Sequence, residues 1–364
     1  MSASVADVIV VRVLHPLPEE GIFVTRVLRW CTLAGITAGL LALTVPASAA
    51  TGWTVVTPPA SAAGAELTGS YALSDTNTWV VGANPGTDAP VALNWNGTTW
   101  SSVPTPRPSG STPNWAFKSV AASSASDAWA VGVQSSGTKI HDSLYEHWNG
   151  TAWSVVAGPN EGVLNAVLDF SPTNAWAFAD FNTLHWNGTA WSVVSGVYGV
   201  GLSVSADGPN DIWGIDRNDI VSHYNGTSWS YYTLTAPSGT PVIESVDALS
   251  STDVWAGGAT TADTSILEHF NGTSWKVMTL PSSLAATGIP AITAKSDSNV
   301  WAFGYGYPPV IANWNGSSWT TSTDPLASGT EVTIGSAASS PGHVWLFGAR
   351  LTSTGYQPLI LSHS

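Results

Sequence analysis

One short pattern recurs along the whole chain and constrains its fold more than any other feature. Tryptophan recurs at seven places, Trp79, Trp129, Trp176, Trp213, Trp255, Trp301 and Trp345, and at all of them except Trp176 a glycine follows within three residues. A second signature, a glycine-containing turn that leads into a tryptophan, recurs at Trp100, Trp153, Trp191, Trp229, Trp275 and Trp319, with a partial copy at Trp53. Self-similarity with a period of roughly 40 to 50 residues is typical of repeat architectures.

One repeat, residues 116–157, shows what each unit forms. Its apolar segments are short, alternate with polar residues and lack helical periodicity, so four antiparallel strands are expected. The dipeptide Asn149-Gly150 predicts a type I′ hairpin between the third and fourth strands, with positive φ at both residues. Seven such units over residues 50–364 predict an all-β, seven-bladed β-propeller of four-stranded antiparallel blades.

The two ends of the repeat region complement each other. The last repeat has a third strand near 359–363 and no fourth strand, whereas residues 52–56 read as a fourth strand with nothing before it. We expect this N-terminal strand to complete the last blade, which closes the ring and removes open sheet edges.

Most of the 20 tryptophans are explained by this fold without any function. Their positions in the second strand, at the end of the third and at the start of the fourth place eighteen indole rings between neighbouring blades. Trp30 lies in the N-terminal segment, and Trp115 alone has no place in the repeat.

Histidines precede the third-strand aromatic in five repeats, at His147, His185, His223, His269 and His363. One per blade, they are too far apart to bind one metal ion. We expect each to form a hydrogen bond with the Asp or Asn two residues before the second-strand tryptophan: Asn77, Asp127, Asn174, Asp211, Asp253 and Asn299. No metal site and no cofactor are predicted.

The first 49 residues read as targeting sequence rather than as part of the fold. Residues 24–49 carry Arg26 and Arg29, an apolar run from Cys31 and a small-residue cleavage site near Ala49-Ala50, which is typical of a secretory signal peptide. Residues 1–23 fit no signal sequence and are interpreted as a mis-annotated start or a disordered leader. The sequence therefore predicts a secreted, extracellular propeller without cysteine, since Cys31 is the only one.

The chain has a net charge of −14. Such an acidic balance argues against nucleic-acid partners and against anionic membranes, and no apolar run after the signal sequence is long enough to insert into a membrane. We expect a monomer whose partner is an extracellular glycan or protein.

Loops that the repeat does not explain carry the candidate ligand-binding residues. In a propeller, the second-to-third and fourth-to-first connections open on one face, where binding sites are usually built. The longest are expected at 104–114 and 134–142. A solvent-facing Trp115 would suit stacking on a sugar or peptide; the alternative is that its ring packs locally against its own blade. The candidates on this face are Trp115, Phe117, Arg107, Lys139, His141, Asp142, Arg217, Tyr305, Tyr307, Arg350 and Tyr356.

No sequence motif for catalysis is present. The chain lacks G-x-S-x-G, H-E-x-x-H, a phosphate loop and a cysteine nucleophile in the propeller. Paired carboxylates for glycoside hydrolysis could still come together from different blades.

The unit S-x-x-[DN]-x-W-A-x-G … L-x-H-W-N-G-T-x-W resembles the repeat of uncharacterised secreted bacterial β-propeller proteins, described as kelch-like or galactose-oxidase-like. The resemblance covers residues 50–364 and implies the fold. It implies no reaction, because the propeller has no cysteine for an oxidase copper site and lacks the Asp-box turn of sialidases.

Three functions remain open. The first is a secreted, non-enzymatic binding or interaction module for a glycan or protein on the loop face. The second is a structural protein associated with the cell envelope. The third is a polysaccharide hydrolase or lyase on a propeller scaffold.

Overall fold

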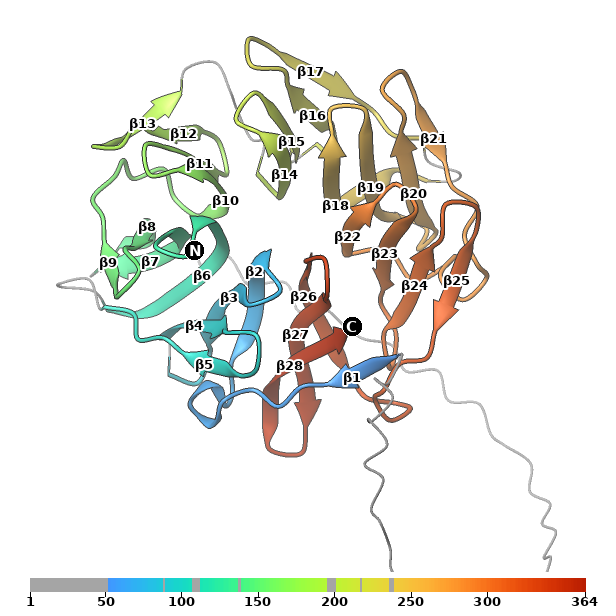
Figure 1. The fold of residues 1–364 in the computed structure, drawn as a ribbon, viewed down its shortest axis with the longest axis horizontal. Helices are drawn as coiled ribbons and strands as arrows, with labels where there is room; N and C mark the ends of the chain where they lie inside the picture. Colours follow the sequence, from blue (N-terminus) through green and yellow to red (C-terminus); the bar gives the residue numbers. More distant parts are fainter. Residues whose placement is uncertain are drawn as a thin grey trace, which may run out of the picture. The chain divides into compact units, whose positions relative to one another are not determined.

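Seven four-stranded antiparallel sheets surround a central channel in the computed structural model (Figure 1). The structure describes residues 52–87, 89–106, 112–136, 139–194, 201–216, 218–235 and 239–364, without the side chains of 112–114, 135–136 and 139–141. The propeller lies in the compact unit Ala49–Ser364. This arrangement confirms the predicted fold.

We number the blades in chain order. Blade 1 is β2 (Glu66–Ser74), β3 (Asn77–Asn84), β4 (Ala89–Trp95) and β5 (Trp100–Ser102). Blade 2 is β6 (Thr112–Ser124), β7 (Asp127–Ser136), β8 (Lys139–Trp148) and β9 (Trp153–Val155). Blade 3 is β10 (Leu164–Ser171), β11 (Asn174–Ala179), β12 (Thr183–Trp186) and β13 (Trp191–Val194). Blade 4 is β14 (Ser203–Gly208), β15 (Asp211–Ile215), β16 (Val221–Tyr224) and β17 (Trp229–Tyr232).

The remaining blades follow the same plan. Blade 5 is β18 (Pro241–Ser250), β19 (Asp253–Thr260), β20 (Ser265–Phe270) and β21 (Trp275–Val277). Blade 6 is β22 (Ala291–Ser296), β23 (Asn299–Gly304), β24 (Val310–Trp314) and β25 (Trp319–Ser322). Blade 7 combines β26 (Val332–Ser339), β27 (Val344–Thr352) and β28 (Gly355–His363) with β1 (Trp53–Val55).

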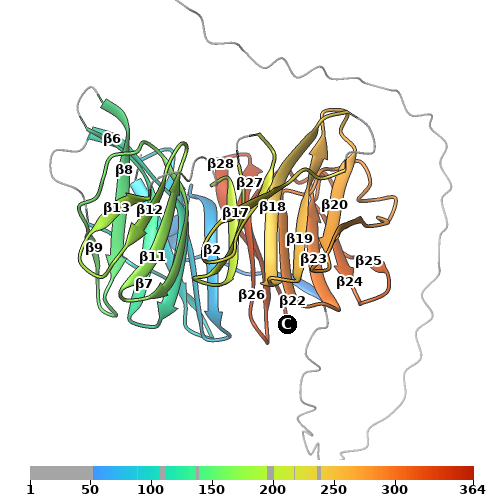
Figure 2. The same ribbon diagram turned by 90° about the horizontal axis from the view of Figure 1, so that it is seen from above.

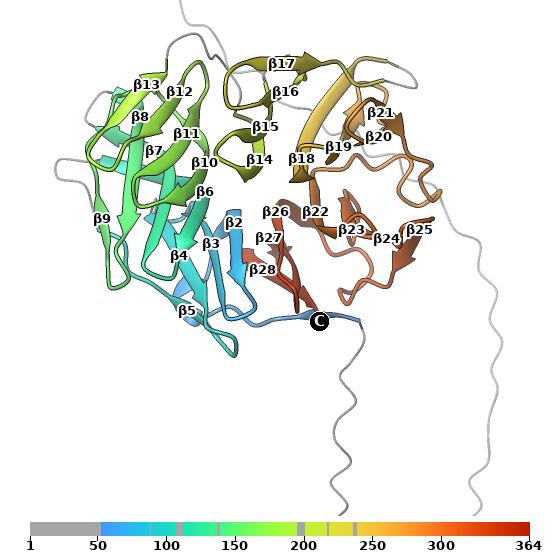
Figure 3. The same ribbon diagram turned by 45° about the horizontal axis from the view of Figure 1, so that its top comes forward.

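The two faces of the propeller differ because strands alternate in direction. The first strand of each blade lines the channel and begins on one face (Figures 2 and 3). The second-to-third and fourth-to-first connections lie on that same face, which we call the loop face. The third-to-fourth hairpins lie on the opposite face, which we call the hairpin face. Any ligand site built from variable loops therefore belongs to the loop face.

Closure of the ring by β1 is confirmed. Trp53, Thr54 and Val55 pair with His363, Ser362 and Leu361 of β28, so the strand nearest the N-terminus completes the sheet nearest the C-terminus (Figure 1). This pairing covers the outer edge of β28 and joins the two ends of the ring.

Tryptophan pairs join the blades as predicted. At six of the seven seams, a second-strand indole packs edge-to-face against the fourth-strand indole of a neighbouring blade, with interplanar angles of 76° to 84°. This T-shaped geometry directs the positive edge of one ring at the negative face of the other. The seam between blades 3 and 4 differs: Trp176 contacts Tyr224, and Trp229 contacts Tyr224 of its own blade.

The hairpins form where predicted, but their turn type is different. Trp95 pairs directly with Trp100, so four residues rather than two form the loop. Asn96 Oδ1 accepts hydrogen bonds from the N–H groups of Thr98 and Thr99 at 3.0 and 2.9 Å. Only the glycine has positive φ, 94° at Gly97, because the asparagine side chain caps the turn without entering the left-handed region. The type I′ prediction was therefore wrong.

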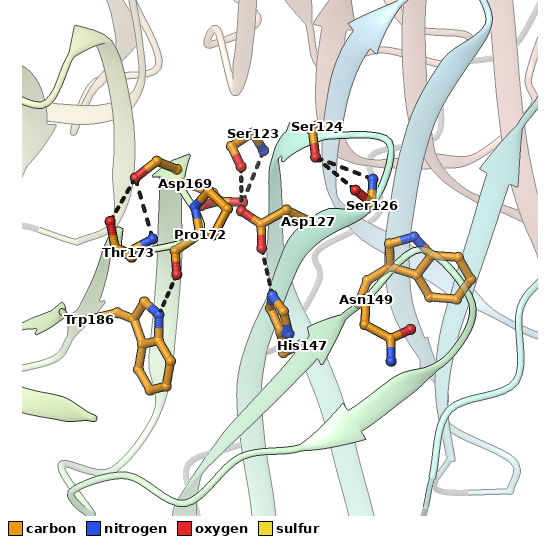
Figure 4. Close-up of polar contacts among 12 residues, drawn as sticks. Ser123, Ser124, Ser126, Asp127, His147, Asn149, Asp169, Pro172, Thr173 and Trp186 are labelled. Carbon is orange, nitrogen blue, oxygen red and sulfur yellow. Dashed lines mark hydrogen bonds and ion pairs between the residues drawn. The ribbon is translucent and has the colours of Figure 1, made fainter. Parts of the chain in front are cut away.

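The predicted hydrogen bonds of the histidines are present in four blades. Nε2 of His147, His185, His223 and His269 lies 2.6 to 2.9 Å from the side-chain oxygen of Asp127, Asn174, Asp211 and Asp253. In blade 2 the network continues: Ser123 Oγ bonds to Asp127, and the Ser123 N–H donates to Asp169 of blade 3 (Figure 4). Burial raises the pKa of Asp169 to about 8. These contacts join second and third strands, and neighbouring blades, on the hairpin-face side.

His363 does not belong to this set. It pairs with Val344, the residue before Trp345, whereas Ser362 pairs with Trp345. His363 therefore occupies the position of the third-strand aromatic, and its ring packs 4.7 Å from that of Trp301 in blade 6. The assignment of His363 was wrong because β28 is shifted by one residue relative to the sequence pattern.

Candidate functional site

Exposed apolar side chains gather on the loop face. Of the large hydrophobic residues that are exposed, one group lies on outer or fourth strands: Val55, Val155, Val193, Tyr231 and Val277. The others all lie on the loop face: Phe181, Leu202, Val242, Tyr305, Tyr307, Leu351 and Tyr356. In the described part of the chain, the hairpin face has none. The loop face therefore has the composition of an interaction surface.

The central channel forms a cavity of about 400 Å³ lined by all seven first strands. Hydroxyl groups in its wall tie neighbouring first strands together: Thr68 Oγ1 donates to the Phe117 carbonyl at 2.9 Å, and Ser205 Oγ donates to Asp247 at 2.9 Å. Asp247 also accepts the Ala294 N–H at 2.7 Å, so it joins blades 4, 5 and 6. Burial raises the pKa of Asp247 to about 6. The deeper wall is thus structural.

β-Bulges shape the mouth of this channel on the loop face. Five first strands shift register by one residue near their start, at Thr68, Lys118, Asn165, Glu244 and Gly335. A bulge re-aims the extra side chain, and all five residues line the cavity. We call these five residues the bulge ring. Its charged members are Lys118 in blade 2 and Glu244 in blade 5.

Carboxylates outnumber cations on the loop face. Lys118 and Arg350 are the basic side chains that the structure describes there. The acidic ones are Glu66, Asp142, Glu161, Asp180, Asp216, Asp219, Glu244, Asp263, Asp324 and Glu331. The described loop face therefore carries ten carboxylates and two basic side chains, an acidic excess. Such a field attracts cationic groups.

Glu244 is the most distinctive group at the channel mouth. Tyr305 Oη donates a hydrogen bond to its Oε1 at 3.3 Å, and its Oε2 is buried without a hydrogen-bond partner. Asp219, in the β15–β16 connection, accepts the N–H of Ile243 at 3.0 Å and so lies beside Glu244. Burial, together with the negative charge of Asp219, raises the pKa of Glu244. Burial and the adjacent Glu244 raise the pKa of Tyr305 to about 12.

The prediction that Trp115 faces solvent was wrong. Its side chain is 3% exposed, and Phe117 is completely buried in the seam between blades 1 and 2. Both belong to β6, which extends the first strand of blade 2 into the expected loop. The burial supports the alternative, that Trp115 packs locally.

The second expected loop, 134–142, is also mostly strand. Residues up to Ser136 continue β7, and β8 begins at Lys139. Lys139 and His141 are in β8, and their side chains lie outside the described residues. Asp142 accepts a hydrogen bond from Asn160 Nδ2. Arg107 and Arg217 lie outside the described residues.

The other predicted residues lie on the loop face but in two separate groups. Tyr305 and Tyr307 are in the β23–β24 connection of blade 6, with 43% and 66% of their surface exposed. Arg350 and Tyr356 are in blade 7, where Leu351 pairs with Tyr356. The structure places Tyr305 beside Glu244, which the sequence did not single out. Their binding roles remain predictions.

The sequence held one signal for Glu244. The equivalent positions of the seven repeats carry Thr68, Lys118, Asn165, Leu202, Glu244, Pro290 and Gly335, and all seven line the cavity. No two of these residues are alike, whereas the flanking positions are mostly small or apolar. A position whose residue differs from one repeat to the next is not needed for packing between the blades.

Comparison with protein-family models and with curated protein sequences finds no match. Similar solved structures include YCF48 bound to a D1 peptide, at 15% identity and TM-score 0.63, covering 85% of this chain and 96% of that one. YCF48 from Cyanidioschyzon merolae matches at 17% identity and TM-score 0.61, over 86% and 98%. The WD40 propeller domain of Doa1 matches at 11% identity and TM-score 0.58, over 86% and 98%. These likenesses show the propeller fold.

No helix in the described residues is long and apolar enough to span a membrane. No cluster of three or more His, Cys, Asp or Glu side chains there is arranged to hold a metal ion.

Proposed function

We propose that this protein is a secreted, non-enzymatic interaction module that binds a protein partner on the loop face. The observation that carries the proposal is the segregation of the surface. The described loop face combines exposed Tyr, Leu, Val and Phe side chains with an excess of carboxylates around a polar channel mouth, whereas the described hairpin face has no large exposed hydrophobic side chain. Exposed apolar patches rimmed by polar groups mark interaction sites.

The mixture of side chains favours a protein partner over a glycan. Leu202, Val242 and Leu351 are exposed aliphatic residues that offer a sugar no hydrogen bonds. They suit the apolar side chains of a protein, and aromatic residues such as Tyr305 and Tyr307 are enriched at protein interfaces. The structural neighbours are consistent with this choice, since one of them is YCF48 with a D1 peptide bound.

Secretion is part of the proposal and rests on the signal-peptide pattern of residues 24–49.

Site-specific photo-cross-linking tests where the partner binds. The full chain, with p-benzoylphenylalanine at Tyr307, is expected to cross-link a protein in the extracellular fraction of its own cells. The matched control carries the same group at Thr273, which is exposed on a hairpin. Cross-linking only at Tyr307 is the expected result; equal cross-linking at both positions, or none at Tyr307, contradicts the proposal.

A second candidate, polysaccharide hydrolysis, is favoured by one observation. Glu244 adjoins Asp219, and glycosidases use a pair of carboxylates in which the general acid has a raised pKa, as Glu244 has. Two observations count against hydrolysis. The raised pKa of Tyr305 disfavours the ionised phenol that a tyrosine nucleophile would need. One carboxylate oxygen of Asp219 already accepts a hydrogen bond from the Ile243 N–H. Release of reducing ends from polysaccharides by wild type, abolished in Glu244→Gln, would replace the binding proposal.

A further inference from the structure

We propose that the channel mouth beside Glu244 receives the side chain of a lysine or arginine from an extended, basic segment of a partner protein. This inference deepens the proposed function and rests on it. The partner offers a cationic side chain flanked by apolar residues, and the carboxylate of Glu244 recognises that side chain.

The carboxylate of Glu244 supplies the first part of the site. Its Oε1 accepts from Tyr305, which fixes the orientation of the group, and its Oε2 has no partner although it is buried. A buried acceptor without a donor is costly, and that cost disappears when a ligand supplies an N–H group. A cationic donor gains more than a neutral one, because charge-assisted hydrogen bonds are about twice as strong.

Asp219 makes the same place favourable for a cation. It lies close enough to Glu244 for its charge to raise the pKa of that group. Two carboxylates at one site repel each other, and a guanidinium or ammonium group between them relieves the repulsion. The ion pairs that the structure describes involve neither Glu244 nor Asp219.

A partly exposed tyrosine, Tyr305, adjoins the Glu244 carboxylate. Tyr305, whose hydroxyl bonds to Glu244, is 43% exposed, and Tyr307 of the same connection is 66% exposed. A cation over the face of a tyrosine ring is attracted by the negative potential of that face. The acidic and aromatic groups therefore favour the same ligand, the long cationic side chain of a lysine or arginine.

The size of the channel limits what can enter. A cavity of about 400 Å³ holds one or two long side chains but not a folded domain, so the segment that crosses the mouth must be extended. Further carboxylates of the loop face, such as Asp216 and Asp263, would attract additional basic residues along that segment.

Fluorescence anisotropy with a defined probe tests the inference. The probe is a fluorescein-labelled peptide, Gly-Ser-Leu-Arg-Leu-Arg-Leu-Ser-Gly, and the matched probe has neutral citrulline in place of both arginines. The full chain is expected to bind the arginine probe at least about tenfold more tightly than the citrulline probe. Glu244→Gln should weaken binding of the arginine probe by about tenfold or more. Glu331→Gln, an equal change of charge at an exposed residue of the same face, should weaken it less than about twofold.

Each outcome decides between the inference and the broader proposal. Equal weakening by Glu244→Gln and Glu331→Gln, or no binding of the arginine probe to the wild type, overturns the inference. If Tyr307 still cross-links a protein in that case, the loop face binds a partner of different chemistry and the proposed function stands. If neither experiment detects binding, both fail. Circular dichroism of both variants confirms that they are folded.

Discussion

Replacing Trp53 by alanine should be one of the most destabilising single changes in this propeller. Trp53 is buried, and its ring contacts Trp301 and Phe303 of blade 6 and His363 of its own blade. Loss of a buried aromatic side chain typically costs about 3 to 5 kcal/mol. In this strand, the loss also weakens the pairing of β1 with β28, which closes the ring. We expect the melting temperature in differential scanning calorimetry to fall by at least about 6 °C.

Trp229→Ala is the matched control for this experiment. The residue opens a fourth strand as Trp53 does, but its ring is only half-buried and contacts Tyr224 of its own blade. We expect a fall less than half as large. Equal falls for the two variants would contradict the idea that closure by β1 makes Trp53 special.

Replacing Glu146 by leucine should have a large effect in the opposite direction. Glu146 is 0% exposed, and neither carboxylate oxygen has a hydrogen-bond partner. The equivalent third-strand positions of blades 1, 3 and 7 carry Leu93, Leu184 and Leu361, so the site accepts leucine. Burial raises the pKa of Glu146 to about 8. Removing this group should stabilise the protein at pH 7 by roughly 3 kcal/mol, at 1.36 kcal/mol for each pKa unit between pH 7 and the unfolded value of 4.5.

The gain in stability from Glu146→Leu should depend on pH. The unfolded chain releases the proton near pH 4.5, whereas the folded chain keeps it until about pH 8. Between these values the folded state binds more protons, so its stability falls as the pH rises. The advantage of Glu146→Leu, measured by chemical denaturation, should therefore be smallest near pH 4 and grow towards pH 8. An advantage that is independent of pH would mean that packing, not charge, causes it. Glu331→Leu, at an exposed site, should show no such trend.

The fold could be predicted because its determinants repeat. Every seam needs large rings at fixed positions, so the tryptophan pattern revealed the blades, their number and the closure by β1. The errors lie where one copy departs from the pattern. His363 follows the sequence spacing, but a one-residue shift of β28 puts it in place of a third-strand aromatic. Trp115 stood out because it lies outside the repeat, yet β6 is long enough to bury it.

The candidate site was predicted only in part for a related reason. Tyr305 and Tyr307 were found because they lie in a connection that the repeat leaves variable. Glu244 was missed because it lies within a strand, where alternation normally assigns each residue to one face or the other. The bulge between Ile243 and Ser245 breaks this alternation and directs Glu244 to the channel mouth, and sequence periodicity does not reveal a bulge.

Hydrogen–deuterium exchange of the full chain, with and without the partner captured at Tyr307, tests the central claim most directly. If the loop face is the binding face, bound partner should slow exchange in residues 239–246 and 301–310, which surround Glu244 and Tyr305. Exchange in the hairpins at 96–99 and 271–274 should not change. Protection confined to the hairpins or to the outer strands, with none around Glu244, would contradict the account.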